Sequence, residues 1–234
     1  MKNRMKILFL CILCVALMLP LASCAKEKGD LLWSEEIEHI SYCVRGKGNN
    51  ARQLVVKEDN KVLWHQTVQI DDSVGNLNGN YGFSVVDLNL DGWLDLMIAQ
   101  KVEGELVSYL CFLKDPDAFN YQLSEELSEL VNIKVDERLG AIFGFSQSVT
   151  YEQEYGDEKP YKVSTDTTTK YVWEGGELIP HTRVSLSYFE KTDRYCYSVA
   201  YYDEVAKEFE ISNDIWLTPE EYAEEDMSFL YYFK

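Results

Sequence analysis

Histidine is scarce in this sequence, with 3 among 234 residues. His39, His65 and His181 lie far apart in the chain, and none belongs to an H-E-x-x-H or similar pair. The cysteines of the predicted mature chain have no close spacing to one another, so a zinc site is not indicated. Proline is also rare, with 5 residues. No proline-, glycine- or serine-rich stretch breaks the chain into separate domains.

Basic residues are few, 22 against 40 acidic ones, which gives a formal net charge of -18. Three of the basic residues, Lys2, Arg4 and Lys6, precede the apolar run described next; without them the balance is 19 against 40, or about -21. A surface of this sign repels nucleic acid and anionic lipid and attracts cations and basic proteins. The alternative is that the acidity only reflects secretion, since many secreted bacterial domains are acidic.

Long hydrophobic runs are absent except at residues 7–19, which follow the basic amino terminus. This run is too short for a bilayer crossing, and Leu21-Ala22-Ser23-Cys24 after it is typical of a bacterial lipobox. The sequence therefore predicts a lipoprotein signal peptide at 1–23, a lipidated tether at 24–33 and a single domain at 34–234. The mature protein would be extracytoplasmic in the bacterial cell envelope, held to the membrane only through lipid on Cys24. An uncleaved anchor or plain secretion is the alternative.

Three cysteines remain in the predicted mature domain once Cys24 carries lipid: Cys43, Cys111 and Cys196. An odd count allows one disulfide and one free thiol, or no disulfide at all. Each cysteine sits in an apolar or aromatic strand pattern, where a thiol behaves as a small hydrophobe. We therefore predict three buried thiols.

The most informative motif is Asp87-Leu88-Asn89-Leu90-Asp91-Gly92-Trp93-Leu94-Asp95, which places oxygen ligands at alternate positions around a glycine. Ca²⁺ takes oxygen ligands, and a short loop can supply them if alternate residues converge while glycine makes the sharp turn. Four side chains and one carbonyl are the predicted ligands: Asp87, Asn89, Asp91, Asp95 and the carbonyl of Trp93. The alternative is a metal-free turn, because Asp, Asn and Gly favour turns by themselves.

The flanks of this motif exclude an EF-hand. Position 12 of the loop is Ile98 instead of a bidentate glutamate. Residues 81–86 before the loop and 96–99 after it have the composition and length of strands. We therefore expect a strand-loop-strand unit.

Strand patterns dominate the rest of the chain. A hairpin turn is predicted at Glu58-Asp59-Asn60 and a two-residue turn at Gly175-Gly176. Helical spacing occurs only at 123–131, and Thr218-Pro219-Glu220-Glu221 is typical of a helix start. The fold class predicted is all-β, β-propeller-like with a large β-sandwich as the alternative, and with one or two short helices. The further strands are predicted at 53–57, 61–68, 109–113, 141–151, 161–165, 170–173, 177–179, 183–190 and 195–202.

Residues 81–100 resemble the calcium-binding strand-loop-strand of FG-GAP and VCBS-type repeats. With three later segments, the chain resembles a family of bacterial envelope proteins with a β-propeller-like fold, some of which inhibit lysozymes. The later segments are 109–115, 119–130 and 171–178. The resemblance implies a surface-anchored Ca²⁺-binding module whose partner is a basic envelope or secreted protein such as a lysozyme.

Two other functions stay open from the sequence, a carbohydrate-binding or adhesion module and an envelope hydrolase. Exposed aromatic residues beside the metal loop would favour the first. For the second, Gly144-Phe145-Ser146-Gln147-Ser148 imitates a nucleophile elbow but ends in serine where glycine is needed. A glycosidase would need two carboxyl groups placed by the fold. We predict no catalytic residue. The exposed excursion at 155–160 is a candidate for a segment that enters an enzyme cleft, with a plain hairpin loop as the alternative.

Overall fold

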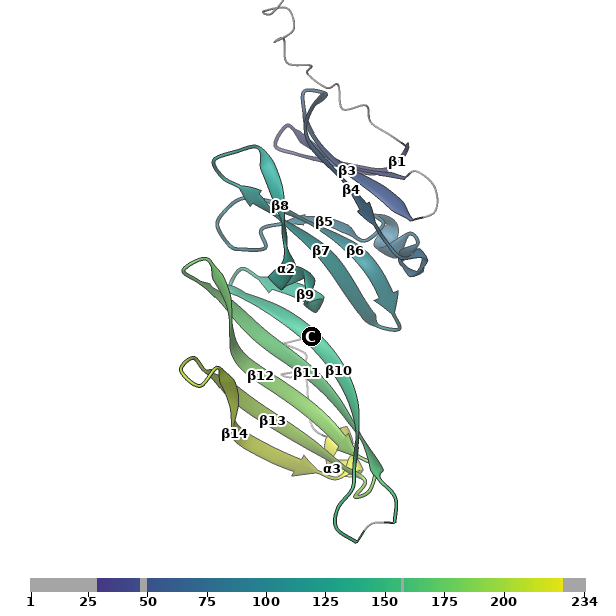
Figure 1. The fold of residues 1–234 in the computed structure, drawn as a ribbon, viewed down its shortest axis with the longest axis vertical. Coiled ribbons are helices and arrows are strands. Elements are labelled where there is room, and N and C mark those ends of the chain that lie inside the picture. Colours follow the sequence, from purple (N-terminus) through teal and green to yellow (C-terminus); the bar gives the residue numbers. More distant parts are fainter. Residues whose placement is uncertain (1–28, 47–49, 157, 225–234) are drawn as a thin grey trace, which may run out of the picture. The chain divides into compact units, whose positions relative to one another are not determined.

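The computed structural model describes residues 29–46, 50–156 and 158–224 (Figure 1), and its contacts group the chain into two compact units, Met1–Val68 and Gln69–Lys234. The predicted signal peptide and Cys24 lie outside the described residues. Within those residues, no helix is long and apolar enough to cross a membrane.

The first unit is a four-stranded antiparallel sheet in the order β1-β2-β3-β4. Its strands are β1 (Asp30–Ile37), β2 (Ile40–Gly46), β3 (Ala51–Glu58) and β4 (Lys61–Gln69). The predicted hairpin between β3 and β4 is confirmed, with Asp59 and Asn60 at φ 47° and 64°, as a tight two-residue turn requires. β1 starts inside the predicted tether. Leu32 lies over Gly46, where an added Cβ would come within 2.8 Å of its Cδ1 atom.

The second unit contains a ten-stranded sheet in the order β14-β13-β12-β11-β10-β9-β7-β6-β5, with β8 paired to β7. Its first strands are β5 (Phe83–Val86), β6 (Asp95–Glu103), β7 (Leu106–Asp115), β8 (Asn120–Ser124) and β9 (Val131–Asp136). Two 3-10 turns, η1 (Asp72–Val74) and η2 (Leu77–Gly79), precede β5, and the short helix α2 (Glu125–Ser128) follows β8.

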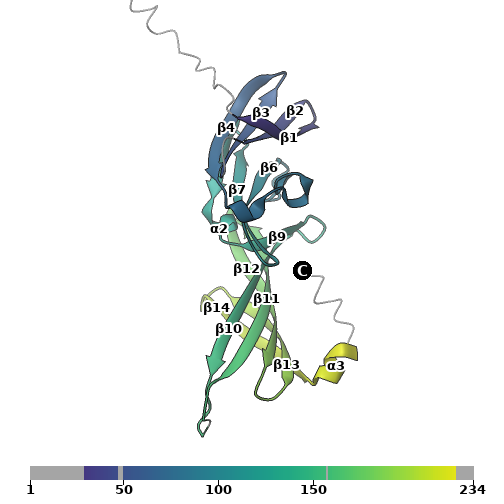
Figure 2. The ribbon, with the colours of Figure 1, turned by 90° about the vertical axis from the view of Figure 1, so that its right-hand side faces the viewer.

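The remaining strands form an antiparallel meander (Figure 2) of β10 (Ala141–Glu152), β11 (Tyr161–Glu174), β12 (Glu177–Phe189), β13 (Arg194–Asp203) and β14 (Glu208–Leu217). β11 joins two strands that the sequence predicts separately, because Thr167, Thr168 and Thr169 between them are β-branched and suit a pleated strand. The predicted turn at Gly175 and Gly176 is confirmed, since Glu174 pairs with Glu177.

Both predicted helices are present and both are short. Ser124 caps α2 by accepting the Leu127 amide at 3.3 Å. The second helix, α3 (Pro219–Glu224), begins with a capping box: the Thr218 hydroxyl accepts the Glu221 amide at 3.2 Å, and the Glu221 carboxylate accepts the Thr218 amide at 2.8 Å.

The all-β prediction is confirmed, because all the described sheet is antiparallel and only two short α-helices accompany it. The propeller-like arrangement is not confirmed. A propeller repeats four-stranded blades, whereas the strands of the second unit share one continuous sheet.

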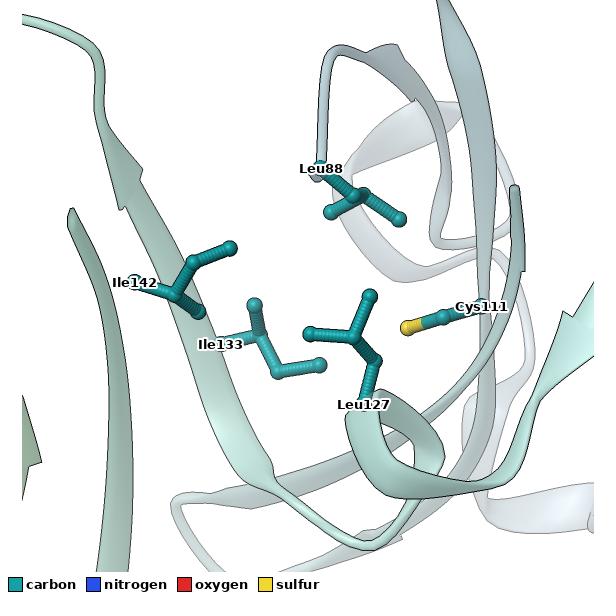
Figure 3. Close-up of a cluster of buried hydrophobic side chains, with 5 residues drawn as sticks. All are labelled: Leu88, Cys111, Leu127, Ile133 and Ile142. Atoms are coloured by element: carbon teal, nitrogen blue, oxygen red, sulfur yellow. The ribbon is translucent and has the colours of Figure 1, made fainter. Parts of the chain in front are cut away.

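One core cluster of the second unit draws on a loop, a helix and three strands (Figure 3). Its members are Leu88, Cys111, Leu127, Ile133 and Ile142. The prediction of buried thiols is confirmed, since Cys43, Cys111 and Cys196 are all free and buried.

Candidate functional site

The aspartate-rich loop connects β5 to β6, as the strand-loop-strand prediction requires. Val86 on β5 pairs with Asp95 on β6 at the base of the loop, so the pairing of the two strands holds the two ends of the loop together. Gly92 has φ 89°, which supplies the left-handed turn. The structure therefore confirms the flanking strands and the role of the glycine.

Three of the predicted ligand side chains converge inside the loop. Asp87 accepts the amides of Asp91 at 3.1 Å and Gly92 at 2.8 Å. Asn89 accepts the Asp91 amide at 3.3 Å, and its own amide nitrogen donates to Asp91 Oδ2 at 2.9 Å. Asp91 also accepts the Trp93 amide at 2.8 Å. The loop thus gathers carboxylate and amide oxygens within one turn.

Asp95 is placed differently from the other three. Its side chain is fully buried and accepts the Leu88 amide and the Lys114 amide, both at 2.7 Å. Burial raises the pKa of this carboxyl to about 7; the two amide hydrogen bonds act in the opposite direction, and Asp91 and Asp87 add a smaller increase. Asp95 therefore ties the loop to β7 as well as ending the motif.

The ligand atoms that the loop offers are of the type that a hard cation prefers. Asp87, Asn89 and Asp91 offer only oxygen ligands, which Ca²⁺ prefers. Binding would replace the hydrogen bond between the Asn89 amide nitrogen and Asp91. Among the described residues, no group of three or more histidine, cysteine, aspartate or glutamate side chains is arranged to hold a metal ion. Asn89 and the Trp93 carbonyl would have to complete the ligand set, because both carboxylate oxygens of Asp95 accept backbone amides.

A cleft of 360 Å³ lies beside the loop. Asn89 and Asp91 line it from the loop, Lys114 from β7, Glu126 from α2 and Trp173 from β11. The segments 109–115, 119–130 and 171–178, on which the family resemblance rests, all contribute to this lining. The fold therefore brings the four segments of the resemblance to one place.

Two exposed aromatic rings lie next to Lys114, which lines the cleft. Lys114 Nζ lies 4.0 Å from the centroid of the Trp93 ring and 5.1 Å from that of Phe119. Trp93 is 45% exposed and Phe119 40%. On the other side, the Trp173 indole donates to the Leu88 carbonyl at 3.0 Å, which fixes the loop against β11.

Sequence reasoning did not single out Lys114, Phe119 or Trp173 as site residues. Their contacts to the loop span 19 residues for the Lys114 amide and 85 for Trp173, so no local pattern could reveal them. The only signal was that each lies in a segment of the resemblance.

The other sequence candidates do not join this site. His39 lies in the turn between β1 and β2, His65 on β4 and His181 on β12, and all three are exposed. Ser146 lies within β10 and not at a strand-to-helix turn, so the nucleophile-elbow geometry does not form. In the excursion between β10 and β11, Tyr155 is fully exposed, while Asp157 is outside the described residues.

No protein-family model matches the chain, and no curated protein matches it. A solved structure described as that of a Xanthomonas type IV secretion system related protein is similar, with 14% identity and a TM-score of 0.48. The match covers 77% of this chain and 92% of that one. A likeness this distant carries no argument about function.

Proposed function

We propose that this chain is a lipid-anchored, extracytoplasmic binding module that takes up Ca²⁺ in the 87–95 loop. The observation that carries the proposal is the convergence of Asp87, Asn89 and Asp91 around Gly92 between two paired strands. The predicted signal peptide and lipobox support the location in the cell envelope. The acidic composition, which repels nucleic acid, fits the same role.

Calcium should stabilise the folded chain, because only the folded loop holds the ligands together. At a concentration about 100 times the dissociation constant, linkage adds about 2.7 kcal/mol to the free energy of unfolding, and it adds much less at concentrations near that constant. Extracellular calcium modules bind at about 10⁻⁴ to 10⁻³ M, so we expect the melting temperature to rise in millimolar Ca²⁺ and to fall with chelator. Calorimetry and thermal melting measure this.

Asp91→Ala should remove most of the calcium response, since it deletes one of the carboxylate ligands of the proposed site. Glu204→Ala is the matched control, because Glu204 is an exposed acid in the turn between β13 and β14. A wild-type melting temperature that is the same in calcium and chelator would show that the loop is a plain turn.

The net charge of the chain and the family resemblance are the grounds for the partner that we infer. A mature surface near -21 speeds encounter with a strongly basic protein through attraction that salt screens over roughly 8 Å. We infer that a lysozyme-like glycosidase is such a partner. True inhibition needs a shaped contact, so it should persist at physiological salt with a slower on-rate. The measurement is muramidase activity against increasing amounts of the chain from Ala25 onward. Inhibition that vanishes at physiological salt would reduce the effect to charge alone.

A carbohydrate-binding or adhesion role is the second candidate, and the exposed rings of Trp93 and Phe119 beside the loop favour it. An aromatic ring offers a flat apolar surface on which the apolar face of a sugar ring can stack. On a glycan array, Trp93→Ala should lose binding. Trp216→Ala on β14 should keep it, although Trp216 is equally exposed at 44%. The envelope hydrolase gains no specific observation and is not proposed.

A further inference from the structure

β10 has an open edge over more than half of its length. It pairs with β11 from Ile142 to Glu152, but β9 covers its other edge only between Ala141 and Phe145. In the part of the chain that the structure describes, no strand pairs with that edge over residues 146–152, and every residue of this segment is exposed. In Figure 1, β10 forms the border of the meander β10–β14.

This edge lacks the devices by which proteins normally protect an exposed strand. Alternate residues of an edge strand direct N–H and C=O groups outward, and charges, prolines, bulges or short length usually discourage pairing there. Residues 146–151 contain no charged residue and no proline, and the open segment ends at the charged Glu152. Val149, Thr150 and Tyr151 are good strand formers. The segment is therefore a template for another strand.

The two ends of the ten-stranded sheet differ from β10 in this respect. β14 carries Glu208, Glu210 and Asp214, and its pairing with β13 is shifted by a bulge at Val199/Ala200. β5 is only four residues long. The charges, the bulge and the short length all discourage edge-to-edge pairing.

We propose that residues 146–152 pair, antiparallel, with the same segment of a second copy of this chain, about a two-fold axis at Val149. In this register Val149 faces Val149, Ser148 faces Thr150, and Gln147 faces Tyr151. Ser146 faces Glu152, so no like charges meet. Pairing covers the exposed side chains of Val149 and Tyr151, which are 53% and 71% exposed. A two-fold contact uses the same surface on both partners, so it closes as a dimer.

A second copy of the chain fits this edge better than a strand from a basic protein. The edge carries almost no charge, so it would not attract a basic strand. The net charge of the mature chain, about -21, lies almost entirely outside this segment, whose one charged residue is Glu152, and it makes two copies repel each other at long range. Added salt screens this repulsion. The dimer should therefore become tighter as salt rises, in contrast to a charge-driven complex. It does not require the calcium loop, so Asp91→Ala should dimerise like the wild type.

The test is sedimentation of the chain from Ala25 onward over a range of concentrations at low and physiological salt. We expect a monomer–dimer equilibrium. Val149→Lys places two lysines directly opposite each other and should weaken the dimer by about tenfold or more. Val149→Asp should do the same. An equimolar mixture of the two variants should dimerise again, because the facing charges are then opposite.

Two control substitutions locate the effect. Val205→Lys changes a 95% exposed valine in the turn between β13 and β14, and Ile211→Lys changes a 66% exposed residue on β14. Both should leave the dimer intact. Hydrogen exchange of the wild type gives an independent measure: the amides of residues 146–152 should become more protected as concentration rises.

A wild type that stays monomeric throughout, with exchange in this segment independent of concentration, would overturn the proposal. So would a dimer that Ile211→Lys dissociates and Val149→Lys does not, or a mixture of Val149→Lys and Val149→Asp that fails to recover. Circular dichroism of each variant confirms that it is folded before its association is compared.

Discussion

At the scale of single residues, Asp95 couples the candidate metal loop to the core. Its carboxylate is fully buried and accepts backbone amides from Leu88 and from Lys114 on β7. A buried aspartate in this position must either be stabilised as a carboxylate by the hydrogen bonds from those amides or take up a proton. The raised pKa, about 7, shows that burial dominates over the two hydrogen bonds.

Asp95 should give the stability of the calcium-free protein a distinctive pH dependence. Its folded-state pKa of about 7 exceeds the ordinary 3.8, so the folded chain binds this proton more tightly than the unfolded chain. The resulting stabilisation is full below about pH 4 and is lost as pH rises towards 7. In chelator, the free energy of unfolding of the wild type should therefore fall over this range relative to that of Asp95→Asn.

Denaturant titrations of both proteins at several pH values measure this difference. The pKa values of Asp71 and Asp203 are lowered by hydrogen bonds and give the opposite pH dependence, but both groups are the same in the two proteins and cancel. Asp95→Asn should also be less stable near pH 4 by about 1 to 3 kcal/mol, because its amide nitrogen faces one of the two backbone N–H groups. Parallel pH profiles for the two proteins would contradict the raised pKa.

At the scale of elements, α2 is too short to be stable by its own hydrogen bonds. A helix of four residues has at most one or two intrahelical bonds. Its position depends on the Ser124 cap and on Leu127, which is fully buried against Leu88 and Ile142. The apolar contacts of Leu127 therefore hold the helix beneath the candidate loop.

Leu127→Ala should lower the free energy of unfolding by about 2 to 5 kcal/mol, because it leaves a cavity in this cluster. Leu123→Ala is the matched control. Leu123 is 49% exposed on β8, and its truncation should cost less than about 0.5 kcal/mol. Equal losses in the two variants, measured by denaturant unfolding, would show that Leu127 is not a core residue.

At the scale of the whole molecule, the acidic charge and the predicted lipid anchor bear on how the protein would be held at a membrane. The chain is strongly acidic, and the predicted lipid on Cys24 would place it beside a membrane whose anionic lipids it does not attract. The predicted lipid alone would then hold the protein at the membrane, since the acidic protein surface adds no attraction.

Cys24→Ala should abolish lipid labelling and release the protein from the membrane fraction, because two or more acyl chains give stable anchoring. Metabolic labelling with a fatty-acid analogue in a bacterial host, followed by fractionation, measures both effects. Cys43→Ala, which alters a buried thiol of β2, should keep the label. Labelling that persists in Cys24→Ala would rule out the lipobox.

The sequence by itself determined the local features of this protein. The loop with its glycine, the hairpin turns at Asp59-Asn60 and Gly175-Gly176, and the capping box at Thr218 each depend on backbone preferences of a few adjacent residues. Alternation of apolar and polar residues was enough for the all-β class and for the three buried thiols. Such signals are readable because their causes lie within a few residues of each other.

Only the tertiary structure decided how the strands combine and what surrounds the loop. Strand order depends on hydrogen bonds between segments far apart in the chain, so the pattern that suggested propeller blades is equally compatible with a continuous ten-stranded sheet. The Asp95–Lys114 bond, the Trp173–Leu88 bond and the open edge of β10 arise in the same way. Each depends on which distant segment lies alongside, and a single sequence does not encode that choice in any local pattern.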